Sequence, residues 1–492
     1  MQKPKLVATL TSADTLASAN LDEVAILEVR ADLTGELSLE WLRSQFPGQL
    51  LYTLRSSAEG GQFSGGAARR AEALVSAARA GFDLIDLEAD RDLGAEVLAA
   101  IPGPQRILSW HGSAADPIDL ARRCSKMAGT PALLYKLIPQ AQQAGQELAP
   151  LQMLAQLKRS DVVSFASGAS GAWSRLVAPH LGAPVVYGAA GGAPGAPGQP
   201  TVERLRSHFG LPNLPTVEVL FGIAGCPVEH SLSPLIHNRA YSMLGLPALY
   251  IPFHAESFGD FWLEVVESEA LSAIGLPLRG LSVTSPFKRV ALAVAGASSP
   301  LAERIGAANT LVWNSGVWEA ESTDPAGIVE PLRLRGISLE GRRAVVVGCG
   351  GAGRSAAVGL LHAQAEVVMA NRSAERGRRA AYDLGLPFLL LEDLEPQAFD
   401  LFINATPLGR SEEDPLPFDL DRLPKRAMVV DMVYGESPTA LVQESQERGW
   451  ITVDGREVLF HQAVVQFRLM TGRELPREAV SEALGLAAGL SK

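Results

Sequence analysis

A lysine inside one apolar segment and a histidine in the segment before it are residues that could do chemistry. Lys136 lies within ALLYKLI, which starts at Ala132. Burying an unpaired ammonium is costly, so a lysine in such a strand is seldom structural. Burial and neighbouring cations lower its pKa and yield the free amine that forms an imine with a carbonyl compound. A lysine that merely reaches solvent from the strand end is the alternative.

His111 ends RILSWH, which starts at Arg106. A neutral imidazole can move protons to and from the carbon next to an imine. Glu59 lies in TLRSSAEGG and could orient this histidine from a loop whose glycines allow closure. A satisfied core histidine is the alternative interpretation. Together the three side chains predict chemistry at a ketone.

A glycine pattern further along predicts a dinucleotide site. Gly348, Gly350 and Gly353 form G-x-G-x-x-G directly after the apolar AVVV and before a helical segment. The first glycine permits a tight turn, the second lets the backbone approach a pyrophosphate, and the third allows close packing of helix and strand. The pyrophosphate would lie at the helix N-terminus, beside Gly351 and Ala352. A glycine-rich turn without a ligand is the alternative.

The end of the next apolar segment favours NADP(H) over NAD(H). An NAD site usually has an acidic residue there, whereas this sequence has Asn371, Arg372 and Ser373. A guanidinium can pair with a 2′-phosphate, and the missing carboxylate removes a repulsion. Arg372 as an ordinary surface residue is the alternative.

The composition of the chain limits the classes of molecule that it can bind. The chain has 492 residues, 47% hydrophobic residues and a formal charge of -11, which suits a globular protein and disfavours non-specific nucleic-acid binding. No apolar run approaches the ~20 residues that span a bilayer. Cys124, Cys226 and Cys349 form neither a metal-ligand spacing nor a disulfide set. We therefore expect a cytoplasmic protein with small-molecule substrates, no metal, no nucleic acid and no membrane partner; the oligomeric state is left open.

The first part of the chain alternates eight apolar runs with helical patterns, which predicts a parallel (β/α)8 barrel of the TIM type. The runs are 5–11, 24–30, 50–55, 83–88, 106–111, 132–138, 161–167 and 184–190. Active sites of such barrels lie at the C-terminal strand ends. Glu28 and Arg30 end the second run, Arg55 the third and Asp86 the fourth.

The remaining chain predicts a second α/β unit. We expect the barrel over 1–210 and a proline-containing linker over 211–218. An α/β substrate domain over 219–334 follows, completed by C-terminal helices in 456–492. A Rossmann NADP domain would occupy 335–455.

The second unit resembles shikimate dehydrogenase. The matching motifs, in order, are HSLSP, VTSPFK, IGAANT, TDPAG, GCGGAGRS, NRS, NATPLG, DMVYGESPTAL and LFHQA. The resemblance implies that Lys288 and Asp324 form the catalytic pair and exchange the proton at the carbonyl oxygen as hydride arrives. It implies that shikimate is held, together with Asp324, by Ser231, Ser233, Thr284, Asn309 and Gln462. It adds Thr406, Met432, Tyr434 and Gly455 as neighbours of cofactor or substrate.

The barrel resembles type I 3-dehydroquinate dehydratase. The matching motifs are EVRAD, TLRSSAEGG, DLIDLEAD, SWH, YKLIP, GAWSR and APGQ. The resemblance implies that Lys136 forms an imine with the substrate ketone, that His111 removes the neighbouring proton, and that Glu59 assists. Substrate carboxylate and hydroxyls would be bound by Arg30, Arg55, Arg175 and Gln199, with Glu28 and Asp86 in support.

The two resemblances together predict a bifunctional enzyme of the shikimate pathway. The barrel would dehydrate 3-dehydroquinate to 3-dehydroshikimate, and the second unit would reduce this product to shikimate with NADPH. One alternative is a catabolic quinate/shikimate dehydrogenase that uses NAD. Another is a barrel retained as a non-catalytic sensor or scaffold.

Overall fold

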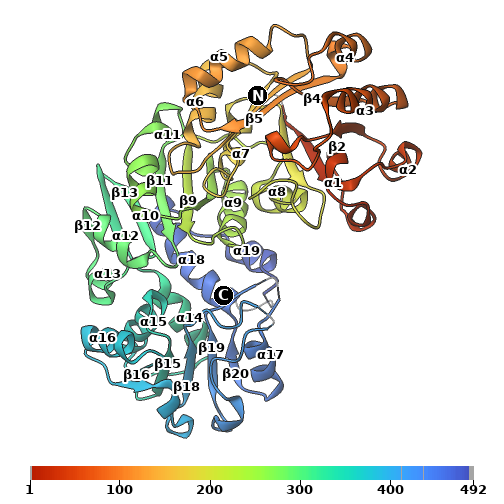
Figure 1. The fold of residues 1–492 in the computed structure, drawn as a ribbon. Coiled ribbons are helices and arrows are strands. Elements are labelled where there is room, and N and C mark those ends of the chain that lie inside the picture. Colours follow the sequence, from red (N-terminus) through yellow and green to blue (C-terminus); the bar gives the residue numbers. More distant parts are fainter. Residues whose placement is uncertain (1–2, 412, 436, 487–492) are drawn as a thin grey trace. The chain divides into compact units, whose positions relative to one another are not determined.

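A computed structural model describes residues 3–411, 413–435 and 437–486. The chain divides into two compact units: residues 1–220 with 247–278, and residues 221–246 with 279–492. Figure 1 colours the chain from red at the N-terminus to blue at the C-terminus. No helix of the described residues is long and apolar enough to cross a membrane.

The first unit contains a nearly closed barrel of eight strands, as predicted. The strands are β1 (Lys5–Leu10), β2 (Val24–Arg30), β3 (Gln49–Thr53), β4 (Leu84–Glu88), β5 (Arg106–Ser113), β6 (Leu134–Gln140), β7 (Val162–Ser164) and β8 (Val185–Ala189). They pair in parallel in the order β7-β6-β5-β4-β3-β2-β1-β8. Strands that are mostly apolar suit this fold, because helices and side chains cover both faces of the sheet.

Helices connect the barrel strands, with one exception to the predicted regular alternation. The α-helices are α1 (Ala31–Thr34), α2 (Leu39–Gln45), α3 (Ala67–Ala80), α4 (Ala95–Ala100), α5 (Pro117–Met127), α6 (Leu148–Leu157), α7 (Ser174–Val177) and α8 (Val202–Phe209). Between β1 and β2 the chain forms only the 3₁₀-helix η1 (Ala13–Ser18). The prediction of an α-helix at this position was therefore wrong. Leu16 is the single buried residue of this short segment, which leaves no apolar face for a longer helix.

Residues 247–278 belong to the barrel's unit by their contacts. They contain β10 (Ala248–His254), α10 (Phe258–Phe261), the π-helical turn η5 (Trp262–Val266) and α11 (Ala270–Ala273). The ring of Phe253 lies edge-on to that of Trp173 with 5.0 Å between centroids. The sequence-derived domain limits, 219–334 among them, stay a prediction.

The second unit begins with a mixed sheet. Its strands β9 (Val219–Gly225), β11 (Leu278–Val283), β13 (Thr310–Asn314), β14 (Val317–Glu321) and β12 (Ala297–Ser298) neighbour one another in this order. The helices α9 (Ser233–Leu244), α12 (Lys288–Val294), α13 (Pro300–Ile305) and α14 (Asp324–Leu334) accompany it. Three of these helices begin with predicted functional residues, Ser233, Lys288 and Asp324.

A parallel sheet of the doubly wound type follows, as predicted. Its order is β17-β16-β15-β18-β19-β20, with β15 (Arg343–Val347), β16 (Glu366–Asn371), β17 (Phe388–Leu390), β18 (Leu401–Asn404), β19 (Met428–Asp431) and β20 (Ile451–Val453). Its helices are α15 (Gly351–His362), α16 (Ala374–Leu384) and α17 (Ala440–Glu447), and two buried apolar clusters cover the two faces of the sheet. This order is the one that binds dinucleotides where the strand order reverses.

The C-terminal helices α18 (Gly455–Thr471) and α19 (Arg477–Ala483) follow β20, and α18 packs against α14. Asp454 and Glu457 form a capping box at the start of α18. Residues 487–492, the end of the predicted C-terminal segment, lie outside the described residues.

Glu147, directly before α6, predicts a pH-dependent stability of the first unit. Its side chain is buried, and Oε1 accepts a hydrogen bond from Trp173 Nε1 at 3.3 Å. Burial raises the pKa of Glu147 to about 7, above its ordinary value of 4.5. Between these pH values the folded state keeps a proton that the unfolded chain has released. The free energy of unfolding therefore falls as pH rises through this window.

We expect Glu147→Gln to remove this contribution, because glutamine stays neutral and keeps an acceptor for Trp173. Denaturant unfolding followed by tryptophan fluorescence at pH 4.5 and 7.5 measures it. The stability of Glu147→Gln relative to the unmodified protein should rise with pH, by at most about 1.4 kcal/mol per pH unit inside the window. A difference independent of pH would contradict the assignment.

Candidate active sites

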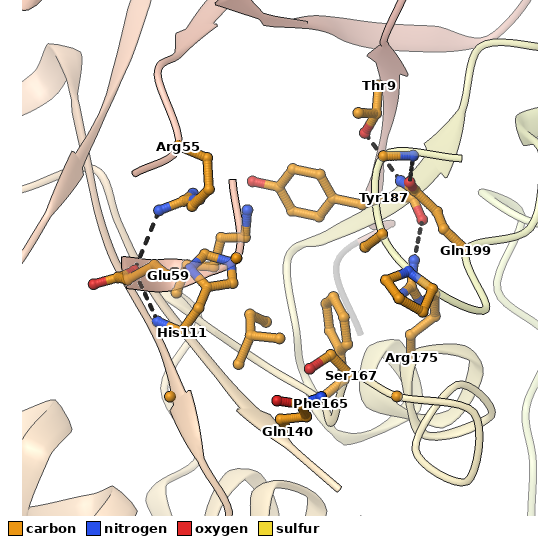
Figure 2. Close-up of a pocket in the computed structure, with 18 of the residues that line it drawn as sticks. Thr9, Arg55, Glu59, His111, Gln140, Phe165, Ser167, Arg175, Tyr187 and Gln199 are labelled. Atoms are coloured by element: carbon orange, nitrogen blue, oxygen red, sulfur yellow. Dashed lines mark hydrogen bonds and ion pairs between the residues drawn. The ribbon is translucent and has the colours of Figure 1, made fainter. Parts of the chain in front are cut away.

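The barrel holds a cavity of about 430 Å³ at the C-terminal ends of its strands. Most of the residues predicted for this site line it: Glu28, Arg30, Arg55, Glu59, His111, Lys136, Arg175 and Gln199. Asp86 is buried beneath them and bonds to Arg55. Figure 2 shows Arg55, Glu59 and His111 on one side of the cavity and Arg175 and Gln199 on the other. The fold thus brings together residues that are spread over 172 positions, from 28 to 199.

Lys136 projects from β6 into this cavity and is 6% exposed. Its Nζ lies 3.9 Å from Glu28 Oε1 and 3.9 Å from Asp86 Oδ2, too far for a short hydrogen bond to either. Burial lowers the pKa of Lys136, while Glu28 and Asp86 partly oppose the shift. The amine is therefore more readily deprotonated than an ordinary lysine, as imine formation requires.

Arg55 follows β3 and bonds to one of the two carboxylates near the lysine, that of Asp86. Its guanidinium donates to Asp86 Oδ1 at 3.0 Å, to Ser109 Oγ at 3.0 Å and to Glu88 Oε1 at 3.2 Å. Burial opposes its charge, but the carboxylates outweigh burial and raise the pKa of Arg55. Arg55 is thus a permanent cation that also helps to lower the pKa of Lys136.

Glu59 and His111 form the predicted pair. Glu59 Oε2 lies 3.1 Å from His111 Nδ1 and accepts the backbone N–H of His111 at 3.0 Å. Burial and the cations Arg55 and Lys136 lower the pKa of His111 well below 6.5, so the imidazole is neutral at neutral pH. Burial and Glu88 raise the pKa of Glu59 to about 7. This arrangement can take a proton at the histidine and stabilise the resulting cation.

The opposite wall can bind an anion. Arg175 packs its guanidinium over the Phe165 ring at 4.7 Å, and burial lowers its pKa to about 10. Its Nε has no hydrogen-bond partner among the described residues. Arg30, in contrast, is paired with Asp32 at 2.8 Å and with the Gly195 carbonyl at 2.7 Å. Arg175 is therefore the better placed of the two for a substrate carboxylate.

Several residues of the barrel site were missed in the sequence. Thr9 and Thr53 donate to the two oxygens of Glu28 at 2.7 and 2.9 Å, and Gln199 donates to Thr9 at 3.0 Å. Ser109, Arg91 and Tyr187 complete the set. Several of them are polar residues at the ends of apolar strands, the signal that identified Lys136. Their partners depend on the strand register, which places Thr9 beside Glu28.

The second unit holds a cavity of about 440 Å³. Lys288 Nζ donates to Asp324 Oδ2 at 2.5 Å, and Asn309 donates to the other oxygen of Asp324 at 2.7 Å. Asn309 also contacts Gln462 at 3.3 Å. Ser231, Ser233 and Thr284 line the same cavity. The predicted catalytic pair is thus formed, with hydroxyl and amide groups gathered around it.

The glycine turn fits a dinucleotide. Gly348 adopts φ +107°, which favours glycine, and a Cβ on Gly353 would lie 1.9 Å from the Gly348 carbonyl oxygen. Gly350 caps the twelve-residue helix α15, and a Cβ there would meet nothing within 4 Å among the described residues. The turn is therefore closed by packing at Gly353 and open toward the cavity at Gly350, as phosphate binding requires.

The other predicted cofactor residues lie around this turn. Ala352, Asn371, Thr406, Met432, Tyr434 and Gly455 line the cavity with Gly348 and Gly350. Gly351 begins α15, while Arg372 and Ser373 follow Asn371 at the exposed end of β16. Asn404, which was not predicted, supports Thr406 by accepting its hydroxyl at 2.7 Å and donates to Asp431 at 2.9 Å.

The first site is that of an imine-forming barrel enzyme, and the second is that of a dinucleotide-dependent dehydrogenase. Residues 6–213 match the family model of type I 3-dehydroquinase. Residues 223–311 match the shikimate dehydrogenase substrate binding domain, and residues 455–484 match the shikimate 5′-dehydrogenase C-terminal domain. Shikimate dehydrogenase (NADP(+)) of Halorubrum lacusprofundi is 38% identical over 54% of this chain and 97% of its own length. The chain belongs to the shikimate dehydrogenase family, and its first part belongs to the type I 3-dehydroquinase family.

A relative with both parts covers nearly the whole chain. The bifunctional 3-dehydroquinate dehydratase/shikimate dehydrogenase of Arabidopsis thaliana, described as chloroplastic, is 29% identical over 97% of this chain and 84% of its own length. Among solved structures, shikimate dehydrogenase from Aquifex aeolicus is similar with a TM-score of 0.50 and 28% identity, covering 55% of this chain and 97% of its own. This chain is a bifunctional dehydratase and dehydrogenase of the shikimate pathway.

The open space at Gly350 predicts that a methyl group there blocks the cofactor without harming the fold. We expect Gly350→Ala to raise the dissociation constant of NADPH at least about tenfold, because the methyl would stand where the backbone must approach the pyrophosphate. Titration by NADPH fluorescence measures the constant, and the unfolding temperature should not change.

Gly66→Ala is the matched control, since Gly66 also caps a helix with extended backbone and open space around it. It should leave both quantities unchanged. Unaltered NADPH binding by Gly350→Ala would show that the turn does not approach the phosphates.

Proposed function

We propose that Lys136 dehydrates 3-dehydroquinate through an imine and that Lys288 and Asp324 assist the NADPH-dependent reduction of 3-dehydroshikimate to shikimate. The observation that supports the dehydration is the buried Lys136 amine, which lies 3.9 Å from two carboxylates and lines the same cavity as a neutral histidine. The 2.5 Å ion pair between Lys288 and Asp324, beside a glycine turn that fits a dinucleotide, supports the second half.

In the barrel, Arg175 binds the substrate carboxylate and Lys136 attacks the ketone carbon. Water leaves and an imine forms, which acidifies the hydrogens on the neighbouring carbon. His111 takes one of these protons, and Glu59 stabilises the imidazolium through Nδ1. The imidazolium then protonates the departing hydroxyl, so a second water is lost and a carbon–carbon double bond forms. Hydrolysis of the imine releases the product and regenerates the amine.

In the second unit, bound NADPH would supply the hydride. The residues placed to hold the cofactor are Gly348, Gly350 and Ala352 at the turn, with Asn371, Thr406 and Met432 around them. Lys288 donates the proton to the substrate's carbonyl oxygen as that oxygen gains charge, and Asp324 orients the ammonium. Asn309 holds the Asp324 carboxylate in place, and Asn309 and Gln462 bind the substrate hydroxyls.

NADP(H) is the proposed cofactor because no carboxylate ends β16. Asn371 turns its amide to the Ser373 carbonyl at 3.0 Å, and the exposed Arg372 lies between them in sequence. Among relatives, the enzymes of Halorubrum and Natronomonas are described as NADP(+) enzymes. We also propose that the protein acts in the cytoplasm, where its three free cysteines would stay reduced.

Separate lysine variants should divide the two reactions. With 3-dehydroquinate and NADPH, the unmodified protein should consume NADPH. Lys136→Ala should not, because the dehydrogenase receives no substrate, yet it should oxidise NADPH normally when given 3-dehydroshikimate. Lys288→Ala should accumulate 3-dehydroshikimate, seen by its ultraviolet absorbance, with reduction slowed by about 10²–10⁴-fold.

Each variant serves as the other's control. Borohydride added with 3-dehydroquinate should leave a covalent adduct on Lys136 of the unmodified protein. Continued NADPH consumption from 3-dehydroquinate by Lys136→Ala, or an unmodified intact mass after borohydride treatment, would exclude the proposed dehydration. Either outcome would favour a barrel that serves only as a scaffold.

Arg372 should set the choice between NADPH and NADH. We expect Arg372→Ala to lower kcat/KM for NADPH by about tenfold and to leave the value for NADH unchanged, because only NADPH has the 2′-phosphate. Initial rates with 3-dehydroshikimate and each cofactor measure the ratio. Arg378→Ala, an exposed change on α16, is the control. An equal loss with both cofactors would contradict a role at the 2′-phosphate.

A further inference from the structure

One phenol side chain of the barrel cavity has no role so far. Tyr187 comes from β8 and is 3% exposed, and its side chain lines the cavity. Its hydroxyl oxygen has no hydrogen-bond partner among the described residues. In Figure 2 the ring of Tyr187 stands in the cavity with its oxygen turned toward Arg55. The catalytic steps derived above do not use this hydroxyl.

Burying such a hydroxyl is unfavourable unless a partner arrives. A phenylalanine would fill the same space and leave no polar atom unsatisfied, so the ring alone does not explain the tyrosine. One more polar atom of the cavity lining is buried without a hydrogen-bond partner among the described residues, Arg175 Nε. Two such atoms in one cavity indicate a ligand that carries polar groups.

The position of the Tyr187 ring indicates which part of the ligand its hydroxyl can contact. Lys136 Nζ lies 4.2 Å from the centroid of the Tyr187 ring. Burial and the carboxylates Glu28 and Asp86 raise the pKa of Tyr187 well above 10, so the group stays a neutral hydroxyl. It can therefore donate a hydrogen bond beside the carbon that reacts with Lys136, but it is a poor proton donor in a transfer step.

We propose that Tyr187 is a further substrate-binding residue and that its hydroxyl donates a hydrogen bond to the C4 hydroxyl of 3-dehydroquinate. The inference rests on the proposed dehydration. The imine carbon, C3, has two ring neighbours. C2 loses its proton to His111 and carries no oxygen, whereas C4 carries a hydroxyl. An oxygen next to the imine carbon and away from His111 is thus the partner that this position can reach.

Removing one oxygen atom from the protein and one from the substrate tests the contact between Tyr187 and the C4 hydroxyl. The full-length protein and Tyr187→Phe are assayed for dehydration of 3-dehydroquinate and of its 4-deoxy analogue. We expect Tyr187→Phe to lower kcat/KM for 3-dehydroquinate by about tenfold, the effect of one buried neutral hydrogen bond. For the 4-deoxy analogue the two proteins should agree within about twofold. Equal losses with both substrates, or no loss with either, would overturn the proposal.

Stability gives an independent readout. Because the Tyr187 hydroxyl makes no bond within the described protein, Tyr187→Phe should unfold at the same temperature as the unmodified protein or at a higher one. Tyr135→Phe is the matched control: this buried phenol on β6 donates to the Thr130 carbonyl at 3.1 Å, outside the cavity. It should lower the unfolding temperature and leave kcat/KM unchanged. Loss of folding in Tyr187→Phe would overturn the proposal, since it would show a structural hydroxyl.

Failure of the dehydration itself is seen separately. If the unmodified protein neither converts 3-dehydroquinate nor forms an adduct on Lys136 with borohydride, the proposed function of the barrel is wrong. If it does both and Tyr187→Phe is indistinguishable from it, only the role of Tyr187 is wrong.

Discussion

The barrel depends on an amine that must be buried among carboxylates without being locked into an ion pair. Lys136 is 6% exposed, and its nearest carboxylate oxygens are 3.9 Å away. A closer carboxylate would favour the ammonium form of Lys136. A wholly apolar pocket would leave the buried carboxylates of Asp86 and Glu28 without a positive charge or hydrogen-bond donor beside them. Arg55 resolves the conflict because it binds Asp86 and Glu88 directly. The hydroxyls of Thr9 and Thr53 occupy Glu28 in the same way.

The second unit places its lysine in direct contact with a carboxylate. Lys288 lies 2.5 Å from Asp324, whose other oxygen is occupied by Asn309. In the reduction proposed above, Lys288 donates a proton while its nitrogen stays in contact with this carboxylate. The two arrangements thus suit the two proposed roles: a nucleophilic amine with no carboxylate in direct contact, and a proton donor held by one. Both lysines lie in regular elements, where the backbone is rigid: Lys136 lies within β6, and Lys288 begins α12.

Much of this could be predicted from the sequence, because the strands are short, apolar and regularly spaced. The eight barrel strands and the strand–turn–helix at Gly348 needed only periodicity and glycine geometry. The segment Ala13–Ser18 was misread because alternation suggests a helix where one buried leucine supports only a 3₁₀ turn. Thr9, Ser109 and Tyr187 were missed for another reason. Each of them acts through atoms on other strands, and the strand register that brings these atoms together is a property of the nearly closed barrel.

The two sites also differ in how much of their hydrogen bonding the protein completes by itself. In the second unit, Asn309 bonds to Thr323, Asp324 and Gln462, so that site is organised before a ligand binds. The barrel leaves polar atoms of Tyr187 and Arg175 unsatisfied among the described residues. Such atoms lower the stability of the free barrel and become favourable only when a ligand supplies their partners. The barrel therefore gains stability when the substrate binds, and the nearly closed sheet around the cavity tolerates the cost of these atoms in the free enzyme.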